Sequence, residues 1–111
     1  MRIATWNLER PKASSGKNTE IIEKLKEVNA DILILTETHS SIDLREKYAH
    51  SLSSDPLLPS EVADYKEGEN RTTIWSKHPM RGPIKTFDSS TSICACVQTP
   101  RGELNLSLIH I

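Results

Sequence analysis

The sequence is poor in the residues that mark specialised protein classes. Among its 111 residues are two cysteines, four glycines and 5% aromatic residues. Two cysteines are too few for a small secreted scaffold built on disulfides. Cys94 and Cys96 are separated by one residue, which disfavours both a bridge between them and a zinc site. We therefore expect buried free thiols. The sequence also lacks the G-x-G-x-x-G turn of a dinucleotide-binding unit.

Long apolar runs and an excess of one charge are also missing. The net charge is -1, from 14 basic and 15 acidic residues, so the chain has no global basic surface for nucleic acid. No segment approaches the roughly 20 apolar residues that span a bilayer, and the first residues do not form a signal-peptide pattern. These absences lead us to expect a cytoplasmic protein of one modest domain, without a membrane span.

Two segments near the start of the chain have the composition of strands. Arg2 to Leu8 alternates in the manner of a strand, and Asp31 to Thr38 contains four consecutive aliphatic residues, typical of a strand buried on both faces. If a helix joins them, the strands should be parallel and should end at one edge of a sheet. Asn7 and Glu37 would then meet at that edge, where open α/β sheets place their sites.

The segment between these strands predicts an amphipathic helix. Asn18 is a suitable N-cap, and Asn29 is a suitable residue for the helix to end on. Apolar residues recur at helical spacing on one side of this segment: Ile21, Ile22, Leu25 and Val28. Together with the two strands, the helix completes a βαβ unit.

The second half of the chain predicts an antiparallel arrangement. Ile42 to Ala49 predicts a short helix, and Ser51 to Pro59 predicts irregular structure. Strands are expected over residues 72–76, 84–88, 93–98 and 103–106, the last two joined by a turn at residues 99–102. We expect Trp6 and Trp75 to pack in the core.

Three segments, in this order, resemble the endonuclease/exonuclease/phosphatase superfamily. They are TWNL at Thr5 to Leu8, DILILTET at Asp31 to Thr38, and TTIWSKHPM at Thr72 to Met80. The resemblance implies a metal-dependent phosphodiesterase or phosphatase related to DNase I and exonuclease III. It also implies an α/β fold, with residues 1–105 forming the N-terminal half of a four-layer α/β sandwich: a βαβ unit followed by antiparallel strands.

The resemblance implies roles for individual residues. The asparagine of the family's first strand and the glutamate of its second belong to the active site, and they correspond to Asn7 and Glu37. Glu37 would bind Mg²⁺ (or Mn²⁺), which commonly takes only one or two carboxylates. Asn7 would orient the phosphate or the attacking water. Position in the chain, and not the resemblance, makes Arg71, His39 and Glu9 candidate contacts to the substrate or its phosphate: Arg71 comes just before an expected strand, and Glu9 and His39 follow Asn7 and Glu37 by two residues.

Other parts of the family's site have no counterpart in the chain. The Gly-Asp-x-Asn strand and the Ser-Asp-His segment, which supply further metal ligands and the general base, are not found in the sequence. We therefore expect the chain alone to be inactive. Because the sequence stops inside an expected strand, we also expect Leu106 to Ile111 to be a non-native terminal scar. The expected partner is a phosphate ester, with nucleic acid as one option. The alternative hypothesis is a non-catalytic α/β binding module.

Overall fold

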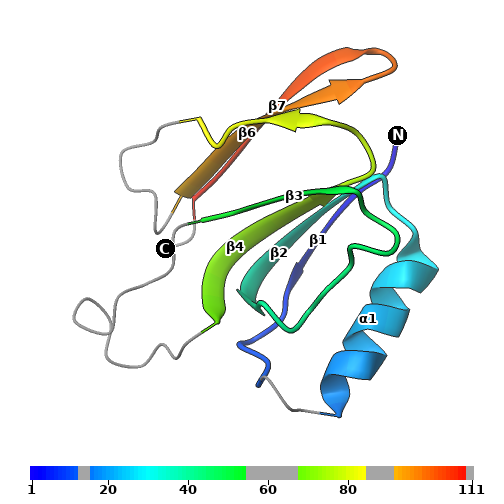
Figure 1. The fold of residues 1–111 in the computed structure, drawn as a ribbon, viewed down its shortest axis with the longest axis vertical. Helices are drawn as coiled ribbons and strands as arrows, with labels where there is room; N and C mark the ends of the chain where they lie inside the picture. Colours follow the sequence, from blue (N-terminus) through cyan, green and yellow to red (C-terminus); the bar gives the residue numbers. More distant parts are fainter. Residues whose placement is uncertain (13–15, 55–67, 85–91, 110–111) are drawn as a thin grey trace.

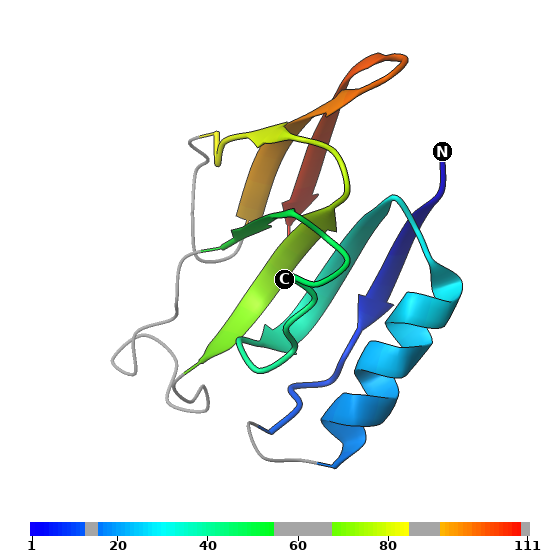
Figure 2. The same cartoon turned by 45° about the vertical axis from the view of Figure 1, so that its right-hand side comes forward.

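One helix and two sheets form three layers in the computed structural model, which describes residues 1–12, 16–54, 68–84 and 92–109 (Figure 1). The elements are β1 (Ile3–Asn7), α1 (Lys17–Val28), β2 (Ile32–His39), β3 (His50–Ser53), β4 (Glu69–Ser76), β5 (Met80–Arg81), β6 (Ser92–Thr99) and β7 (Gly102–Ile109). Sheet A has the strand order β1-β2-β4-β3, and sheet B has the order β5-β6-β7. The helix covers one face of sheet A, and sheet B lies against the other face (Figure 2).

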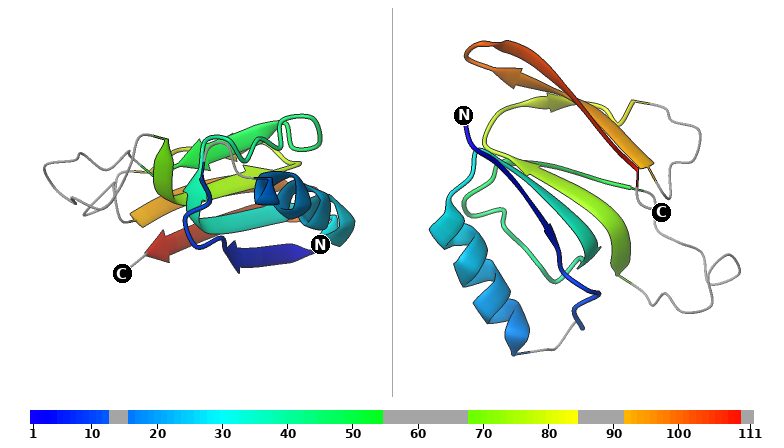
Figure 3. Two further views of the ribbon diagram at one scale, coloured as in Figure 1. Left: turned by 90° about the horizontal axis from the view of Figure 1, so that it is seen from below. Right: turned by 180° about the vertical axis from the view of Figure 1, so that it is seen from behind.

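The predicted βαβ unit is confirmed. β1 and β2 are parallel neighbours, with Ile3 opposite Ile32 and Asn7 opposite Thr36, and α1 makes the connection between them. The view from behind shows the helix running alongside the β1 edge of sheet A (Figure 3). The rest of sheet A is antiparallel, because β4 pairs in that sense with both β2 and β3. This agrees with the expected half-sandwich.

The helix begins two residues earlier than predicted. Gly16 occupies the N-cap position of α1, and the prediction of Asn18 as N-cap is wrong. The Asn18 side chain is buried, and its Nδ2 donates to the Lys12 carbonyl oxygen at 2.7 Å, so it fastens the preceding loop to the helix. Asn29 ends α1 as predicted, with φ 50°. Within the described residues, no helix is long and apolar enough to cross a membrane.

Sheet A has an apolar cluster on each face. The cluster on the helix side contains Leu8, Leu25, Ala30, Leu33, Leu35, Ile42, Leu44, Tyr48 and Trp75. The cluster between the sheets contains Ile32, Ile74, Ile93, Ala95 and Val97. Trp75 is buried, with 7% of its surface exposed, as predicted. Trp6 is 40% exposed, so its predicted place in the core is wrong, because it lies on the edge strand β1.

The predicted helix over Ile42 to Ala49 is wrong. This segment contains a turn, in which the Tyr48 N–H donates to the Leu44 carbonyl oxygen at 2.9 Å. Ile42, Leu44 and Tyr48 are buried at a spacing that does not match one face of a helix. The Tyr48 hydroxyl also donates to the Ala30 carbonyl oxygen at 2.8 Å, so side-chain contacts to the core determine the path of this loop.

The remaining strand predictions are mostly confirmed. β4, β6 and β7 contain the segments expected at 72–76, 93–98 and 103–106, and the hairpin turn lies where it was predicted. Two short strands were missed: β3 overlaps the start of the stretch predicted to be irregular, and β5 has only two residues. The strand expected at 84–88 lies almost wholly outside the described residues, as does most of the Ser51 to Pro59 segment.

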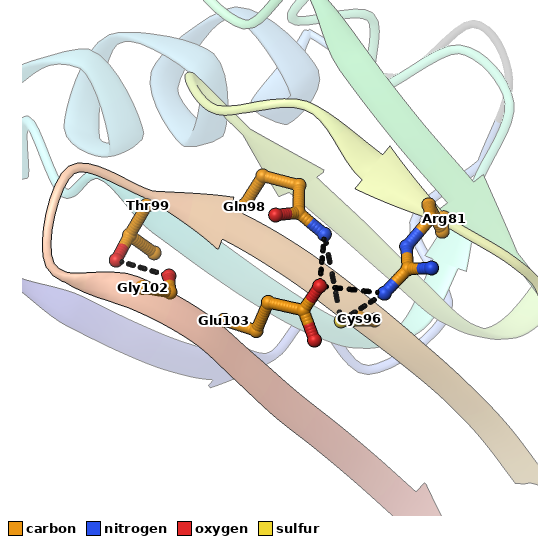
Figure 4. Close-up of polar contacts among 6 residues, drawn as sticks. All are labelled: Arg81, Cys96, Gln98, Thr99, Gly102 and Glu103. Carbon is orange, nitrogen blue, oxygen red and sulfur yellow. Dashed lines mark hydrogen bonds and ion pairs between the residues drawn. The ribbon is translucent and has the colours of Figure 1, made fainter.

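The outer face of sheet B is polar around Cys96. Both cysteines are free thiols, as predicted, although Cys94 is only half-buried. Arg81 Nη2 donates to Glu103 Oε1 at 2.8 Å, Gln98 Nε2 donates to the same oxygen at 3.1 Å, and both donors also contact Cys96 Sγ (Figure 4). The donated bond from Gln98 and the charge of Arg81 lower the pKa of the Glu103 carboxyl. This network covers the buried thiol.

The amino ends of β1 and β2 are joined by Asp31. Its carboxylate accepts a bond from the Arg2 backbone N–H at 2.7 Å, and this bond, with the nearby charges of Lys77 and other cations, lowers the pKa of Asp31. The ionised form therefore stabilises the fold above the unfolded pKa of about 3.9, and this stabilisation is lost as the pH falls through the lower folded pKa.

We predict that Asp31→Asn lowers the free energy of unfolding at pH 7 and has little effect at pH 2. The effect at pH 7 should stay below about 1 kcal/mol, because solvent screens a partly exposed carboxylate. Urea unfolding of both proteins at both pH values measures it, with the exposed helix residue Glu23→Gln as control. An Asp31→Asn deficit of equal size at both pH values would contradict the prediction.

Candidate active site

The register of sheet A brings Asn7 and Glu37 together at the edge of the sheet where the carboxyl ends of β1 and β2 lie. Asn7 is opposite Thr36, the residue before Glu37, and the Leu8 N–H donates to the Thr36 carbonyl oxygen at 2.9 Å. Neighbouring strands lie about 4.8 Å apart, and successive Cα atoms about 3.8 Å apart, so the Cα atoms of Asn7 and Glu37 lie within roughly 9 Å of each other. The structure therefore places these two predicted site residues next to each other.

The Asn7 carboxamide has a defined orientation. Its Oδ1 accepts a bond from the Glu9 backbone N–H at 3.4 Å. This contact holds the oxygen toward the loop that follows β1, and it directs the Nδ2 group, which is a donor, the other way. Asn7 is solvent-exposed at the end of its strand, so an anion approaching this edge can reach the donor.

Glu37 interrupts the ladder between β2 and β4. The register pairs Thr36 with Thr72 and Thr38 with Asn70, and the rung between these pairs, where Glu37 would lie opposite Arg71, is skipped. The Glu37 backbone has a φ of 47°, a left-handed conformation that is rare for a residue with a long side chain. The skipped rung places Glu37 beside Arg71 and breaks the alternation of side chains along β2 at this point.

Left-handed backbone is concentrated at this edge of the sheet. Among the described non-glycine residues, Glu9, Arg10, Asn29 and Glu37 have positive φ, and only Asn29 belongs elsewhere, at the end of α1. Such conformations cost free energy and gather at functional sites, where the surrounding contacts hold them. Three of them at one sheet edge indicate a site built with a specific backbone geometry.

An ion pair that the sequence did not reveal joins the loop after β1 to β4. Arg10 Nε and Nη2 both contact Glu69 Oε2, at 3.2 and 3.1 Å, and the Glu69 side chain is only 8% exposed. The Arg10 backbone N–H also donates to the Glu37 carbonyl oxygen at 2.8 Å. Neither residue belongs to a motif, and the left-handed turn at Arg10 involves no glycine, so no sequence signal pointed to this contact.

The three candidate substrate contacts, Arg71, His39 and Glu9, lie at the rim of this edge. Arg71 lies between Asn70 and Thr72, the β4 residues that pair with β2 on either side of Glu37, and His39 Nδ1 accepts the Ser41 N–H at 3.0 Å. Glu9 is exposed in the loop after β1. β1 ends at Asn7, so Glu9 does not continue the strand and instead has left-handed backbone.

The Glu37 carboxylate suits a hard cation. Glu37 is half-buried, and Mg²⁺ prefers oxygen ligands and keeps several waters, so the carboxylate fits its coordination shell. In β4, the buried Asn70 Oδ1 and Thr72 Oγ1 on either side of Arg71 have no hydrogen-bond partner in the described part of the chain. No group of three or more acidic, histidine or cysteine residues forms a complete metal site within the described ranges.

A cleft lined by basic residues opens next to this edge. It has a volume of about 440 Å³ and lies between the loop after β1 and the start of α1. Arg10, Lys12 and Lys17 line it, together with Glu9 and apolar residues. Arg10 is paired with Glu69, so Lys12 and Lys17 are the cationic side chains that would lie near an anion bound at this edge.

The chain matches one family model and is similar to two solved structures. Residues 4–107 match the model of the Endonuclease/Exonuclease/phosphatase family. Among solved structures, the chain is similar to the endonuclease domain of TRAS1, a telomere-specific non-LTR retrotransposon, with 13% identity and a TM-score of 0.65 over 99% of this chain and 45% of that one. It is also similar to an endonuclease/exonuclease/phosphatase from Beutenbergia cavernae DSM 12333, with 16% identity and a TM-score of 0.66 over 99% of this chain and 38% of that one.

These matches differ in what they establish. The identities to the two solved structures are so low that they show the shared fold alone, and the chain spans less than half the length of each. No match is found among curated proteins. The family model, in contrast, extends over nearly the whole sequence and includes both Asn7 and Glu37. The chain belongs to the endonuclease/exonuclease/phosphatase family.

Proposed function

We propose that this chain supplies part of the active site of a metal-dependent phosphoesterase, which hydrolyses a phosphodiester or a phosphomonoester. The observation that carries the proposal is the meeting of Asn7 and Glu37 at one sheet edge, with Glu37 in left-handed backbone. Membership of a family of nucleases and phosphatases supports phosphate-ester chemistry. The strained backbone supports a functional role for Glu37, because a left-handed conformation costs free energy and a residue that only ends a strand can adopt extended backbone instead.

Each residue has a role that follows from its chemistry. Glu37 would provide a carboxylate ligand for Mg²⁺ or Mn²⁺, and Asn7 Nδ2 would donate to a phosphate oxygen or to the attacking water. Arg71 would donate to another phosphate oxygen through a charge-assisted bond. The bound cation supplies charge neutralisation on the phosphate and a more acidic water. His39 and Glu9 would contact the substrate at the rim of the site.

The metal site and the substrate would both involve groups beyond these residues. One carboxylate is enough to begin a Mg²⁺ site, and waters, the substrate phosphate or further protein ligands would complete its coordination. Lys12 and Lys17 in the neighbouring cleft favour a substrate with negative charge next to the reacting phosphate, of which a nucleic acid is one example.

Calorimetric titration of the chain with MnCl₂, in the absence and presence of bis(p-nitrophenyl) phosphate, tests this proposal. We expect one Mn²⁺ per chain, competition by Mg²⁺, and binding of the phosphodiester that requires the metal. Release of p-nitrophenolate measured in parallel shows whether the chain alone also performs hydrolysis. Phosphodiester binding that is the same in EDTA would instead support the non-catalytic binding module, and a chain that binds no Mn²⁺ would contradict the metal role.

A further inference from the structure

We infer that Arg10 is a positioning residue for Glu37, holding its backbone in the left-handed conformation from which the carboxylate reaches the metal. This inference rests on the proposed function of Glu37 as a metal ligand. It concerns a residue that no motif includes, in the loop between β1 and α1. Three features of Arg10 support it: its backbone hydrogen bond, its ion pair and its own backbone conformation.

The backbone N–H of Arg10 provides a partner for the displaced Glu37 carbonyl group. Where the β2–β4 ladder skips the rung between Glu37 and Arg71, the Glu37 carbonyl oxygen accepts the Arg10 N–H at 2.8 Å. A main-chain carbonyl that leaves a ladder needs another donor, because an unsatisfied polar group destabilises the arrangement. The position of the Arg10 N–H therefore determines whether Glu37 can stay out of the ladder.

The Arg10 side chain attaches the loop that carries the Arg10 backbone N–H to sheet A. It contacts Glu69 Oε2 through two nitrogens, at 3.1 and 3.2 Å, and Glu69 is buried at the start of β4, opposite His39 of β2. The Arg10 side chain is 33% exposed, but Glu69 is buried, so separating the pair would leave the Glu69 carboxylate with an uncompensated charge. The loop after β1 is thereby attached to the two strands that hold Glu37 and Arg71.

The loop needs such an attachment because its own backbone is strained. Glu9 and Arg10 are consecutive and have φ values of 57° and 59°, and neither is a glycine. Without the ion pair, the loop would relax toward ordinary backbone and the Arg10 N–H would move away from Glu37. Glu37 could then return to an extended conformation and pair with Arg71, which would turn its carboxylate toward a different face of the sheet.

The test compares Arg10→Gln and Glu69→Gln with Arg45→Gln, which removes a distant exposed ion pair to Asp43. We expect both variants at the Arg10–Glu69 pair to raise the Mn²⁺ dissociation constant about 10-fold, as observed when groups that orient metal ligands are lost. The double variant should show little further loss, because both changes break one interaction. Arg10→Lys should retain part of the Mn²⁺ affinity, because lysine keeps the positive charge but cannot donate to Glu69 through two nitrogens.

A second measurement separates positioning from general destabilisation. The three-bond HN–Hα coupling of Glu37, measured by NMR in the metal-free folded protein, reports its φ angle. We expect this coupling to move toward the value of an extended strand in Arg10→Gln and to stay unchanged in Arg45→Gln. If Arg10→Gln does not fold, Arg10→Lys and Glu69→Gln serve for the same comparison.

The two measurements also distinguish the inference from the proposal beneath it. An unchanged Glu37 coupling together with an unchanged Mn²⁺ affinity in folded Arg10→Gln would overturn the positioning role. Failure of the unaltered chain to bind Mn²⁺ would overturn the proposed function instead, and the Glu37 coupling would still decide whether Arg10 holds the backbone of Glu37.

Discussion

Replacing Glu37 with glutamine should weaken Mn²⁺ binding by at least about 100-fold, the upper end of the losses seen when groups that merely orient a metal ligand are removed. The substitution keeps the shape of the side chain but removes the negative charge, and a neutral amide oxygen is a much weaker partner for a divalent cation. Phosphodiester binding in the presence of Mn²⁺ should fall to the level measured in EDTA. In a polypeptide that carries the complete family domain, hydrolysis should decrease by a similar factor or more.

This prediction has a matched control and a clear opposite outcome. Glu27→Gln makes the same chemical change on the exposed face of α1 and should leave Mn²⁺ binding unaltered. The free energy of unfolding should be nearly the same for Glu37→Gln and the unaltered chain, because the backbone conformation is retained. An unchanged Mn²⁺ affinity in Glu37→Gln would remove Glu37 from the metal site.

Gly68→Ala should reduce the free energy of unfolding by about 2–4 kcal/mol, from unfavourable backbone conformation together with steric overlap. Gly68 precedes β4 with φ 85°, and an added Cβ would lie 2.6 Å from His39 Cε1, 2.7 Å from His39 Nε2 and 2.9 Å from Ser40 Oγ. The Ser40 N–H also donates to the Gly68 carbonyl oxygen at 2.8 Å, so the two segments cannot separate without losing that bond. Urea unfolding measures the change.

Two further variants separate the causes of this effect. Gly102→Ala also places a side chain at positive φ (121°) but meets nothing within 4 Å, so it should cost only the backbone strain, about 1–2 kcal/mol. Combining His39→Ala with Gly68→Ala removes the closest overlap, and the double variant should be more stable than the sum of the single effects indicates. Equal losses in Gly68→Ala and Gly102→Ala would show that the contact with His39 is unimportant.

The sequence predicted those parts of the fold whose apolar residues form a continuous run or recur at a regular spacing. The aliphatic run from Ile32 to Leu35 identified β2, and the apolar stripe of α1 identified the crossover, so the parallel pairing of β1 with β2 followed from chain topology. β3 could not be found in this way, because His50–Ser53 contains a single apolar residue and is a strand only through its pairing with β4. Trp6 was misplaced because hydrophobicity does not show which strand lies at a sheet edge.

The candidate site was predictable to a similar extent. The positions of Asn7 and Glu37 at strand ends, and the direction of those strands, predicted that the two residues would meet. The contacts of Arg10 depend on two consecutive left-handed residues and on a partner 59 positions away along the chain, and local sequence patterns carry no information about either. The skipped rung at Glu37 is likewise a feature of pairing between strands that propensities do not describe.

The left-handed backbone of Glu37 sets stability and activity against each other at a single position. Glycine adopts a φ of 47° without steric penalty, so it would relieve the strain at this point in β2. The same replacement would delete the carboxylate proposed to bind the metal. A mutant library screened only for thermal resistance would therefore enrich variants that have lost this group, and stabilising designs for this chain should keep position 37 fixed.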